Sequence, residues 1–112
     1  MPIDSEPGPA FDLEAMRTHA GEAVAMLKVL GNADRLMLLC QLTGQSRTVG
    51  ELEQLTGIVQ PTLSQQLGVL RREGLVSTQR EGKYIYYQLA DARALQLMQV
   101  VHEIFCKQGA RA

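Results

Sequence analysis

Two short helices separated by only three residues, the second of them amphipathic, constrain the fold of this chain more than any other feature. Thr48 begins Thr-Val-Gly-Glu, a capping box, and the helix "VGELEQLTG" that follows stops at Gly57. Only "IVQ" stands before Pro61, a favoured first residue of a helix. The next helix runs to Glu73, has Gly74 just beyond its end, and repeats its leucines at helical spacing. The pair predicts a helix-turn-helix.

The segments on both sides of this pair complete the predicted fold. "LVSTQR" and "KYIYYQL" are rich in β-forming residues and flank "EG", which predicts a hairpin. Before the pair, a helical period runs from Asp12 to about Leu30, and Asn32 can cap a helix "ADRLMLLCQL". Asp91 caps a last helix whose apolar arc is wide enough to pack on its own domain and on a second copy. The order α-α-α-α-β-β-α, mainly α with a β-hairpin wing, predicts a winged helix-turn-helix.

Length and composition limit the class of protein. The 112 residues allow one compact domain, predicted over 11–108, after a flexible tail over 1–10 that holds three prolines and a glycine. No apolar run approaches the roughly 18–20 residues that span a bilayer, and the N-terminus lacks the basic start and apolar core of a signal peptide. We therefore expect a cytoplasmic protein without a membrane partner, in which both cysteines are reduced at rest.

The outer side of the helix after Pro61 predicts a partner. It contains no acid, and its residues are Pro61, Thr62, Ser64, Gln65, Gly68, Val69 and Arg72. Gln pairs with adenine, Ser and Thr bond to bases or phosphate, and Arg suits guanine or phosphate, while Pro61 and Gly68 let the backbone approach closely. The net charge is −1, but residues 60–87 carry four bases against two acids. This side therefore predicts binding to double-stranded DNA.

Two other classes of function compete with DNA binding. No Gly-x-Ser-x-Gly elbow, phosphate-binding loop or Cys-x-x-Cys motif occurs, so the sequence predicts neither an enzyme nor a cofactor. A winged helix used only for protein contact would agree with the slightly acidic composition. Such a protein would gain nothing from an acid-free outer side on this helix.

The stretch "ELEQLTGIVQPTLSQQLGVLRREGLVSTQREGKYIYYQL" resembles the DNA-binding half of the ArsR/SmtB family of bacterial winged-helix repressors. The likeness extends from about Val24 to Lys107. It implies a homodimer joined through the first and last helices, which binds its operator DNA in the absence of inducer. Carried over position by position, the resemblance implies DNA contacts from Gln60, Thr62, Ser64 and Gln65, and from Arg80 and Lys83 in the wing.

The metal sites known in this family are predicted to be absent. One site needs a Cys-Val-Cys stretch before the recognition helix, where this chain has "RTVGELEQL". The other needs an Asp-x-His pair followed by His-x-x-Glu or His-x-x-His in the last helix. Asp91 is present, but the remaining positions hold Arg93, Ile104 and Lys107. Asp91 is therefore interpreted as a helix cap.

Cys40 and Cys106 occupy the positions of the two cysteines in the family's dithiol subgroup, represented by BigR, SqrR and HlyU. That resemblance implies a redox switch in which reactive sulfur species, such as a persulfide, or oxidants link the two cysteines and release the operator. It also implies control of sulfide-detoxification genes. From the residues alone, each cysteine equally suits a small buried apolar position. A thiolate site for a metal or metalloid also stays open, because His102 and Cys106 are four apart and Cys40 would be a third ligand.

Overall fold

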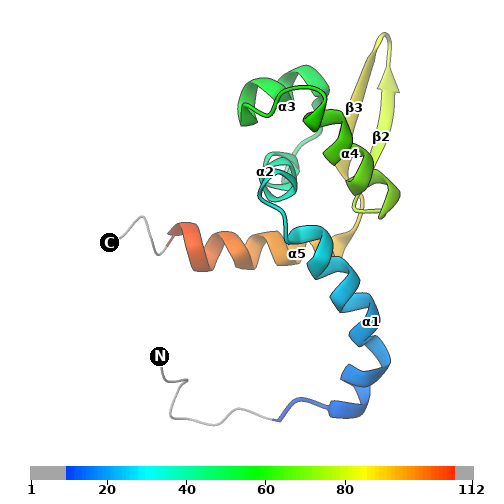
Figure 1. The fold of residues 1–112 in the computed structure, drawn as a ribbon, viewed down its shortest axis with the longest axis vertical. Helices are drawn as coiled ribbons and strands as arrows, with labels where there is room; N and C mark the ends of the chain where they lie inside the picture. Colours follow the sequence, from blue (N-terminus) through cyan, green and yellow to red (C-terminus); the bar gives the residue numbers. More distant parts are fainter. Residues whose placement is uncertain (1–9, 108–112) are drawn as a thin grey trace.

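The computed structural model describes residues 10–107 and confirms the predicted winged helix-turn-helix (Figure 1). The predicted tail over 1–10 lies, apart from Ala10, outside the described residues, as does residue 108. The elements in chain order are α1 (Leu13–Leu30), α2 (Ala33–Leu42), β1 (Arg47–Thr48), α3 (Val49–Thr56), α4 (Thr62–Arg72), β2 (Val76–Glu81), β3 (Tyr84–Leu89), α5 (Ala92–Val101) and the π-helical turn η1 (His102–Lys107).

Side-chain caps explain where four of the helices begin. Asp12, Asn32 and Asp91 each accept a backbone N–H of the first turn, at 3.2, 3.0 and 2.8 Å respectively. Thr48 and Glu51 form the predicted capping box, in which each residue's side chain accepts the other's backbone N–H. Each cap satisfies a donor that has no partner within its helix, worth about 1 kcal/mol.

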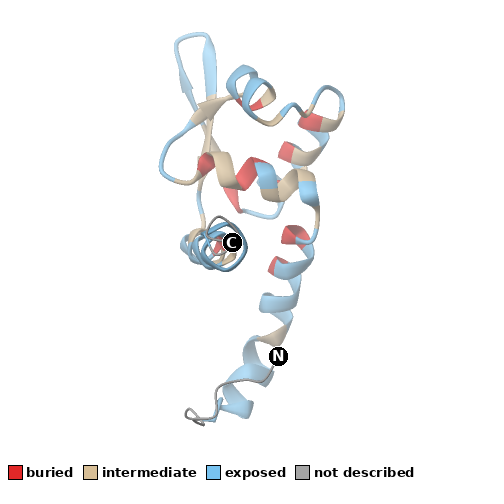
Figure 2. Ribbon diagram, turned by 90° about the vertical axis from the view of Figure 1, so that its left-hand side faces the viewer, coloured by how far each residue is buried: buried red, intermediate tan, exposed pale blue. Residues whose placement is uncertain are grey.

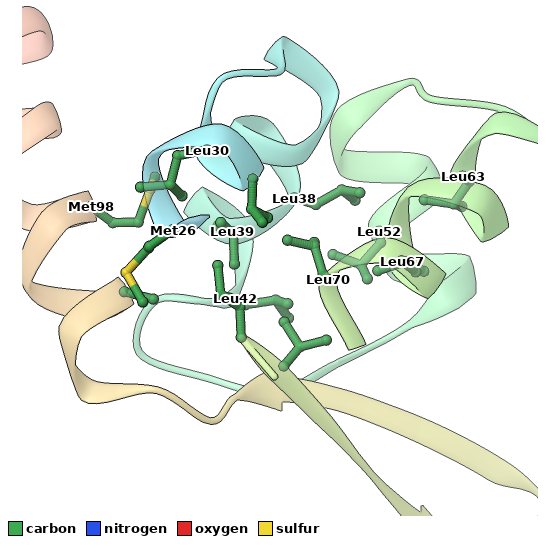
Figure 3. Close-up of a cluster of buried hydrophobic side chains, with 14 residues drawn as sticks. Met26, Leu30, Leu38, Leu39, Leu42, Leu52, Leu63, Leu67, Leu70 and Met98 are labelled. Atoms are coloured by element: carbon green, nitrogen blue, oxygen red, sulfur yellow. The ribbon is translucent and has the colours of Figure 1, made fainter. Parts of the chain in front are cut away.

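Leucines from three helices fill the centre of the core (Figure 3). They are Leu38, Leu39 and Leu42 of α2, Leu52 of α3, and Leu63, Leu67 and Leu70 of α4. Met26 and Leu30 of α1 and Met98 of α5 pack at one side of this cluster. α2 is therefore the shared support that contacts α1, α3 and α4, while α5 joins the core through Ala94 and Met98.

A three-stranded antiparallel sheet of order β1-β3-β2 carries the wing. β2 and β3 form the predicted hairpin, in register from Val76 opposite Leu89 to Glu81 opposite Tyr84. Arg47 and Thr48 also pair with β3, and the sequence did not predict this strand. Two residues show no strand periodicity, so this short strand exists only because β3 lies beside it.

The molecule has two differently built ends. α3, α4 and the hairpin gather at one end, and the first half of α1 extends away from them (Figure 1). α1 buries only Met26, Val29 and Leu30, all near its C-terminus, so most of this helix is exposed (Figure 2). Among the helices of residues 10–107, none combines the length and apolar character required to cross a bilayer.

Candidate nucleic-acid interface and thiol pair

α4 presents a distinct inner and outer face because its leucines repeat at helical spacing. Leu63, Leu67 and Leu70 are at most 1% exposed, which orients the helix. The opposite side, called here the outer face, is exposed and consists of Pro61, Ser64, Gln65, Gly68 and Arg72. Thr62 lies half-buried beside it. α4 therefore offers a hydroxyl, an amide and a guanidinium to a partner, with no carboxylate among them.

The start of α4 uses one of the predicted contact residues for its own stability. Pro61 precedes the helix instead of opening it and makes no side-chain cap. Gln60 supplies the missing acceptor, because its Oε1 accepts the backbone N–H of Ser64 at 3.0 Å. The sequence did not predict this cap, since Gln is not a usual capping residue.

The end of α4 fixes where the wing begins. Gly74 has φ +80°, a conformation that favours glycine. Its N–H donates to the carbonyl of Arg71 at 3.1 Å, and the N–H of Leu75 donates to the carbonyl of Leu70 at 3.0 Å. This is a Schellman motif. Leu75 is buried, so the wing leaves the helix in one defined direction.

The wing carries Arg80 and Lys83 in different settings. Arg80 pairs with Ile85 and shares a sheet face with the buried Val76, which is the face toward the helices. Its Nε donates to the carbonyl of Gly82 at 3.1 Å. Lys83 was expected to follow the turn, but Glu81 still belongs to β2, so Gly82 and Lys83 are the turn itself. Both bases are exposed.

The bases of α4 and the wing are not neutralised by the chain. Across residues 10–107, the ion pairs lie on α1, α5 and η1, and none includes Arg71, Arg72, Arg80 or Lys83. Lys83 Nζ instead lies 5.6 Å from the ring centre of Tyr84. These four bases of α4 and the wing therefore form no ion pair within the described residues, although Glu73 and Glu81 stand next to Arg72 and Arg80 in the chain.

The two cysteines are free thiols in different environments. Cys40 of α2 is half-buried and packs against the core, whereas Cys106 of η1 is exposed. Cys40 lines a groove of about 550 Å³. One wall comes from Cys40, Thr43 and Gly44, and the opposite wall comes from α5 and η1, with Leu95, Met98, Gln99, His102, Glu103 and Lys107. Three residues of the six-residue turn η1 thus line the groove beside Cys40, whereas Cys106, in the same turn, does not line it.

The described residues do not assemble a metal site. His102 lines the groove with Cys40, but no three His, Cys, Asp or Glu side chains within residues 10–107 lie close enough to hold an ion. Asp91 caps α5 and binds Arg93, whose Nη2 lies 3.0 Å from its Oδ2. That hydrogen bond from Arg93 holds the pKa of the Asp91 carboxyl below its usual value. Asp91 therefore acts as the predicted helix cap.

The outward faces of α1 and of the last helix are apolar and exposed. They comprise Leu13, Met16, Val24 and Leu27 on α1 and Val100, Ile104 and Phe105 on α5 and η1. Phe105 is 72% exposed, more than a phenylalanine in a folded protein usually is. Larger apolar patches on soluble proteins commonly mark sites of protein contact.

Arg35 is a further residue of interest that the sequence analysis did not single out. It is the third residue of α2 and is half-buried, and its guanidinium bonds to two carbonyls of α1 and to Gln66 of α4. The available signal was its isolation, because it is the only base in α2, and the five residues that follow it are apolar.

A helix-turn-helix with an acid-free outer face, followed by a hairpin with unpaired bases, defines a winged-helix DNA-binding protein. The model for the bacterial regulatory proteins of the ArsR family matches residues 32–78. The biofilm growth-associated repressor of Xylella fastidiosa is 49% identical over 104 residues, which are 93% of this chain and 91% of that protein. The chain belongs to the ArsR family and is a DNA-binding transcriptional regulator.

Solved structures agree with this assignment. The transcriptional repressor BigR from Xylella fastidiosa is 50% identical, with a TM-score of 0.82 over 86% of this chain and 98% of that one. Reduced HlyU from Vibrio cholerae is 34% identical, with a TM-score of 0.78 over 84% and 99%. The homodimeric winged helix-turn-helix domain of Mb0332 from Mycobacterium bovis is 27% identical, with a TM-score of 0.71 over 92% and 94%. These relatives are regulators, which confirms that the chain is not an enzyme.

Proposed function

We propose that the protein is a cytoplasmic, homodimeric repressor that releases its operator DNA when Cys40 and Cys106 become linked by a reactive sulfur species or an oxidant. Its target genes would serve sulfide detoxification. The observation that carries the switch is the groove beside Cys40, because its opposite wall includes Lys107, the chain neighbour of Cys106. The name of the Xylella relative, a repressor, supports the direction of regulation.

In the proposed complex, α4 lies in the major groove of DNA. Gln65 reads an adenine, Ser64 and Thr62 bond to base edges or phosphate, and Arg72 contacts guanine or phosphate. The side-chain amide nitrogen of Gln60, which the cap leaves free to donate, would bond to the same partner. Arg80 and Lys83 reach the adjacent phosphates or the minor groove, as wing residues do.

In the proposed dimer, the exposed apolar faces of α1 and of α5–η1 pack on a second copy. This assembly covers Leu27, Ile104 and Phe105, which the single chain leaves exposed. The homodimeric domain of Mb0332 supports it. Two-fold symmetry would place the two α4 helices in successive major grooves, so the operator is an imperfect palindrome with half-sites about 10 bp apart.

The proposed switch is a two-electron oxidation of the thiol pair. A thiolate of the pair attacks the outer sulfur of a low-molecular-weight persulfide, forming a cysteine persulfide and releasing the parent thiol. The second thiolate then attacks the inner sulfur of that group, which forms a disulfide and releases hydrogen sulfide. The protein loses two electrons and two protons, and the persulfide is reduced to its parent thiol and hydrogen sulfide. Further persulfide would insert additional sulfurs into the bridge.

A link between Cys40 and Cys106 would act on DNA binding through α2. This helix supports α3 and α4 through the leucine core, whereas η1 continues the helix proposed to form the dimer. Fixing α2 against η1 changes the spacing or mobility of the two α4 helices of the dimer. A coupling free energy of about 1–3 kcal/mol would lower operator affinity about 5- to 150-fold. π-helical turns such as η1 are found frequently at functional sites.

A gel shift with wild type, Cys40→Ser and Cys106→Ser tests the proposal. The probe is a duplex that reduced wild type selects from a random library, and the inducer is glutathione persulfide. All three reduced proteins should bind equally, and only wild type should release the probe. A single mutant that releases DNA as readily as wild type would rule out the thiol pair.

Intact mass identifies the product. We expect a species two hydrogens lighter than the reduced chain, or that lighter mass plus one or more whole sulfur atoms, with no second polypeptide attached. Release by stoichiometric zinc, cadmium or arsenite without any response to persulfide would replace this proposal with a thiolate metal sensor built on Cys40, Cys106 and His102.

A further inference from the structure

Arg35 connects three helices. Its Nε donates to the carbonyl of Val29 at 2.7 Å, and its Nη2 donates to that of Lys28 at 3.4 Å. Its Nη1 donates to Oε1 of Gln66 at 2.8 Å. Val29 and Lys28 lie in the last turn of α1, Arg35 in the first turn of α2, and Gln66 in the middle of α4. One guanidinium therefore joins α1, which has the exposed apolar face, α2, which contains Cys40, and α4, which has the acid-free outer face.

The chemistry of arginine suits this junction. The last carbonyls of α1 have no partner within the helix, and the negative end of the helix dipole favours a cation there. The planar guanidinium holds several donors in a fixed arrangement, so it sets the relative position of its three acceptors as a lysine would not. Arg35 is half-buried, which reduces the screening of these charge-assisted bonds.

Gln65 and Gln66 are adjacent in sequence but differ in surroundings. Gln65 is exposed on the outer face, whereas Gln66 is half-buried and bound to Arg35. A rotation of α4 about its axis, or a shift along it, would break the 2.8 Å bond to Arg35. The bond therefore adds to the buried leucines of α4 in fixing the direction in which the outer face points.

We propose that Arg35 is a positioning residue for DNA recognition. Through Gln66 it holds α4 at the angle at which the outer face fits the major groove, and it passes a movement of α2 to α4. The inference rests on the proposed function, because it assumes that α4 reads DNA and that a link at Cys40 moves α2.

The test uses full-length variants at Gln66, which leave Arg35 and its bonds to α1 in place. Gln66→Met keeps the length of the side chain but removes the acceptor, and Gln66→Glu restores an acceptor for the guanidinium. Gln65→Met is the matched control, since it makes the same change one residue away on the outer face. Affinities are measured for the duplex selected by wild type and for a random duplex, with reduced and with persulfide-treated protein.

Gln66→Met should lower the ratio of operator to random affinity about 10- to 150-fold, the range that corresponds to loss of one hydrogen bond to a charged group. Random affinity should stay unchanged, because phosphate contacts are insensitive to the fine orientation of the helix. Gln66→Glu should restore the ratio. The persulfide response should shrink in Gln66→Met but keep its full size in Gln65→Met, which loses only base reading.

A merely structural role for the Arg35–Gln66 bond would lower the thermal midpoint of Gln66→Met and leave the operator-to-random ratio unchanged, and this result would overturn the inference. Wild-type behaviour of Gln66→Met in every measurement would also overturn the inference. In both cases the proposed function survives if wild type selects a sequence and responds to persulfide. If wild type selects no sequence, the inference fails together with the proposed function.

Discussion

Gly68 offers a test of the outer face in which stability and function should change in opposite directions. It lies in the interior of α4, where glycine is less favourable than alanine by about 0.5–1 kcal/mol. A Cβ added at this position would meet no atom of the chain within 4 Å. The fold itself therefore gives no reason for glycine here, and we attribute it to the close approach of DNA.

The size of both effects follows from this geometry. Gly68→Ala should stabilise the fold by about 0.5–1 kcal/mol, which raises the thermal midpoint by about 2–8 °C in a domain of this length. The added methyl group would lie between α4 and the groove floor and push the helix outward. Loss of the equivalent of one base contact, about 1–3 kcal/mol, would lower operator affinity about 5- to 150-fold.

Thermal unfolding followed by circular dichroism and a gel shift on the selected duplex measure the two effects. Gly21→Ala is the matched control, because Gly21 also lies within a helix, α1, and its added Cβ would also meet nothing. This control should gain stability and keep wild-type affinity. If Gly68→Ala is stabilised and binds the operator as tightly as wild type, the outer face does not approach DNA as argued.

Three further predictions concern bases, assembly and pH. Gln65→Ala should reduce discrimination between operator and random DNA by about 1–3 kcal/mol. Lys83→Ala should instead weaken binding to operator and random DNA alike, and should lower the slope of log affinity against log salt concentration by about one unit. Equal behaviour of the two variants in a competition gel shift would contradict these roles. Phe105→Glu should split the dimer into monomers, as measured by light scattering, because it would bury an unpaired carboxylate in the apolar interface. Ile85→Glu on the wing is the control and should stay dimeric. A dimeric Phe105→Glu would show that the interface lies elsewhere. Arg93 lowers the pKa of Asp91, and His19 followed by Arg93 lowers the pKa of Glu22. Lowered carboxylate pKa values stabilise the fold at neutral pH, and this stabilisation is lost as pH falls below the ordinary pKa values of 4.5 and 3.8 and through the lowered ones of the folded state. Urea midpoints of wild type and Arg93→Ala should therefore differ at pH 7 and converge once the pH is below the lowered pKa values, and a gap that stays constant throughout an acid titration would exclude the ionic explanation.

Features governed by residues a few positions apart were predictable from sequence. The capping box of Thr48 and Glu51 and the ends of helices at Gly57 and Gly74 depend on neighbours along the chain, and the structure confirms them. The outer face of α4 was predictable for the same reason, because helical periodicity alone places Gln65 opposite the leucines.

Features that depend on distant partners were not predictable. β1 forms because Thr48 meets Tyr86, far along the chain. Arg35 meets Gln66, 31 residues later, and nothing local signals that bond. The groove beside Cys40 likewise exists only when α5 and η1 fold back against α2. Sequence identified the two cysteines, but the space between their elements required the tertiary structure.

Thr48 belongs to two elements at once, since it pairs with Tyr86 of β3 and caps α3. The wing and the helix pair are thereby tied together and should move as one rigid lever, with the junction near α2 and α5 as its pivot. The molecule is 54 Å long. At half that length from the pivot, a rotation of about 5° carries the tip of the lever about 2 Å, which is the scale of the helix shifts that switch regulatory proteins. A sulfur–sulfur bond is also about 2 Å long. Formation of one such bond near the pivot and the movement at the tip are therefore of similar size.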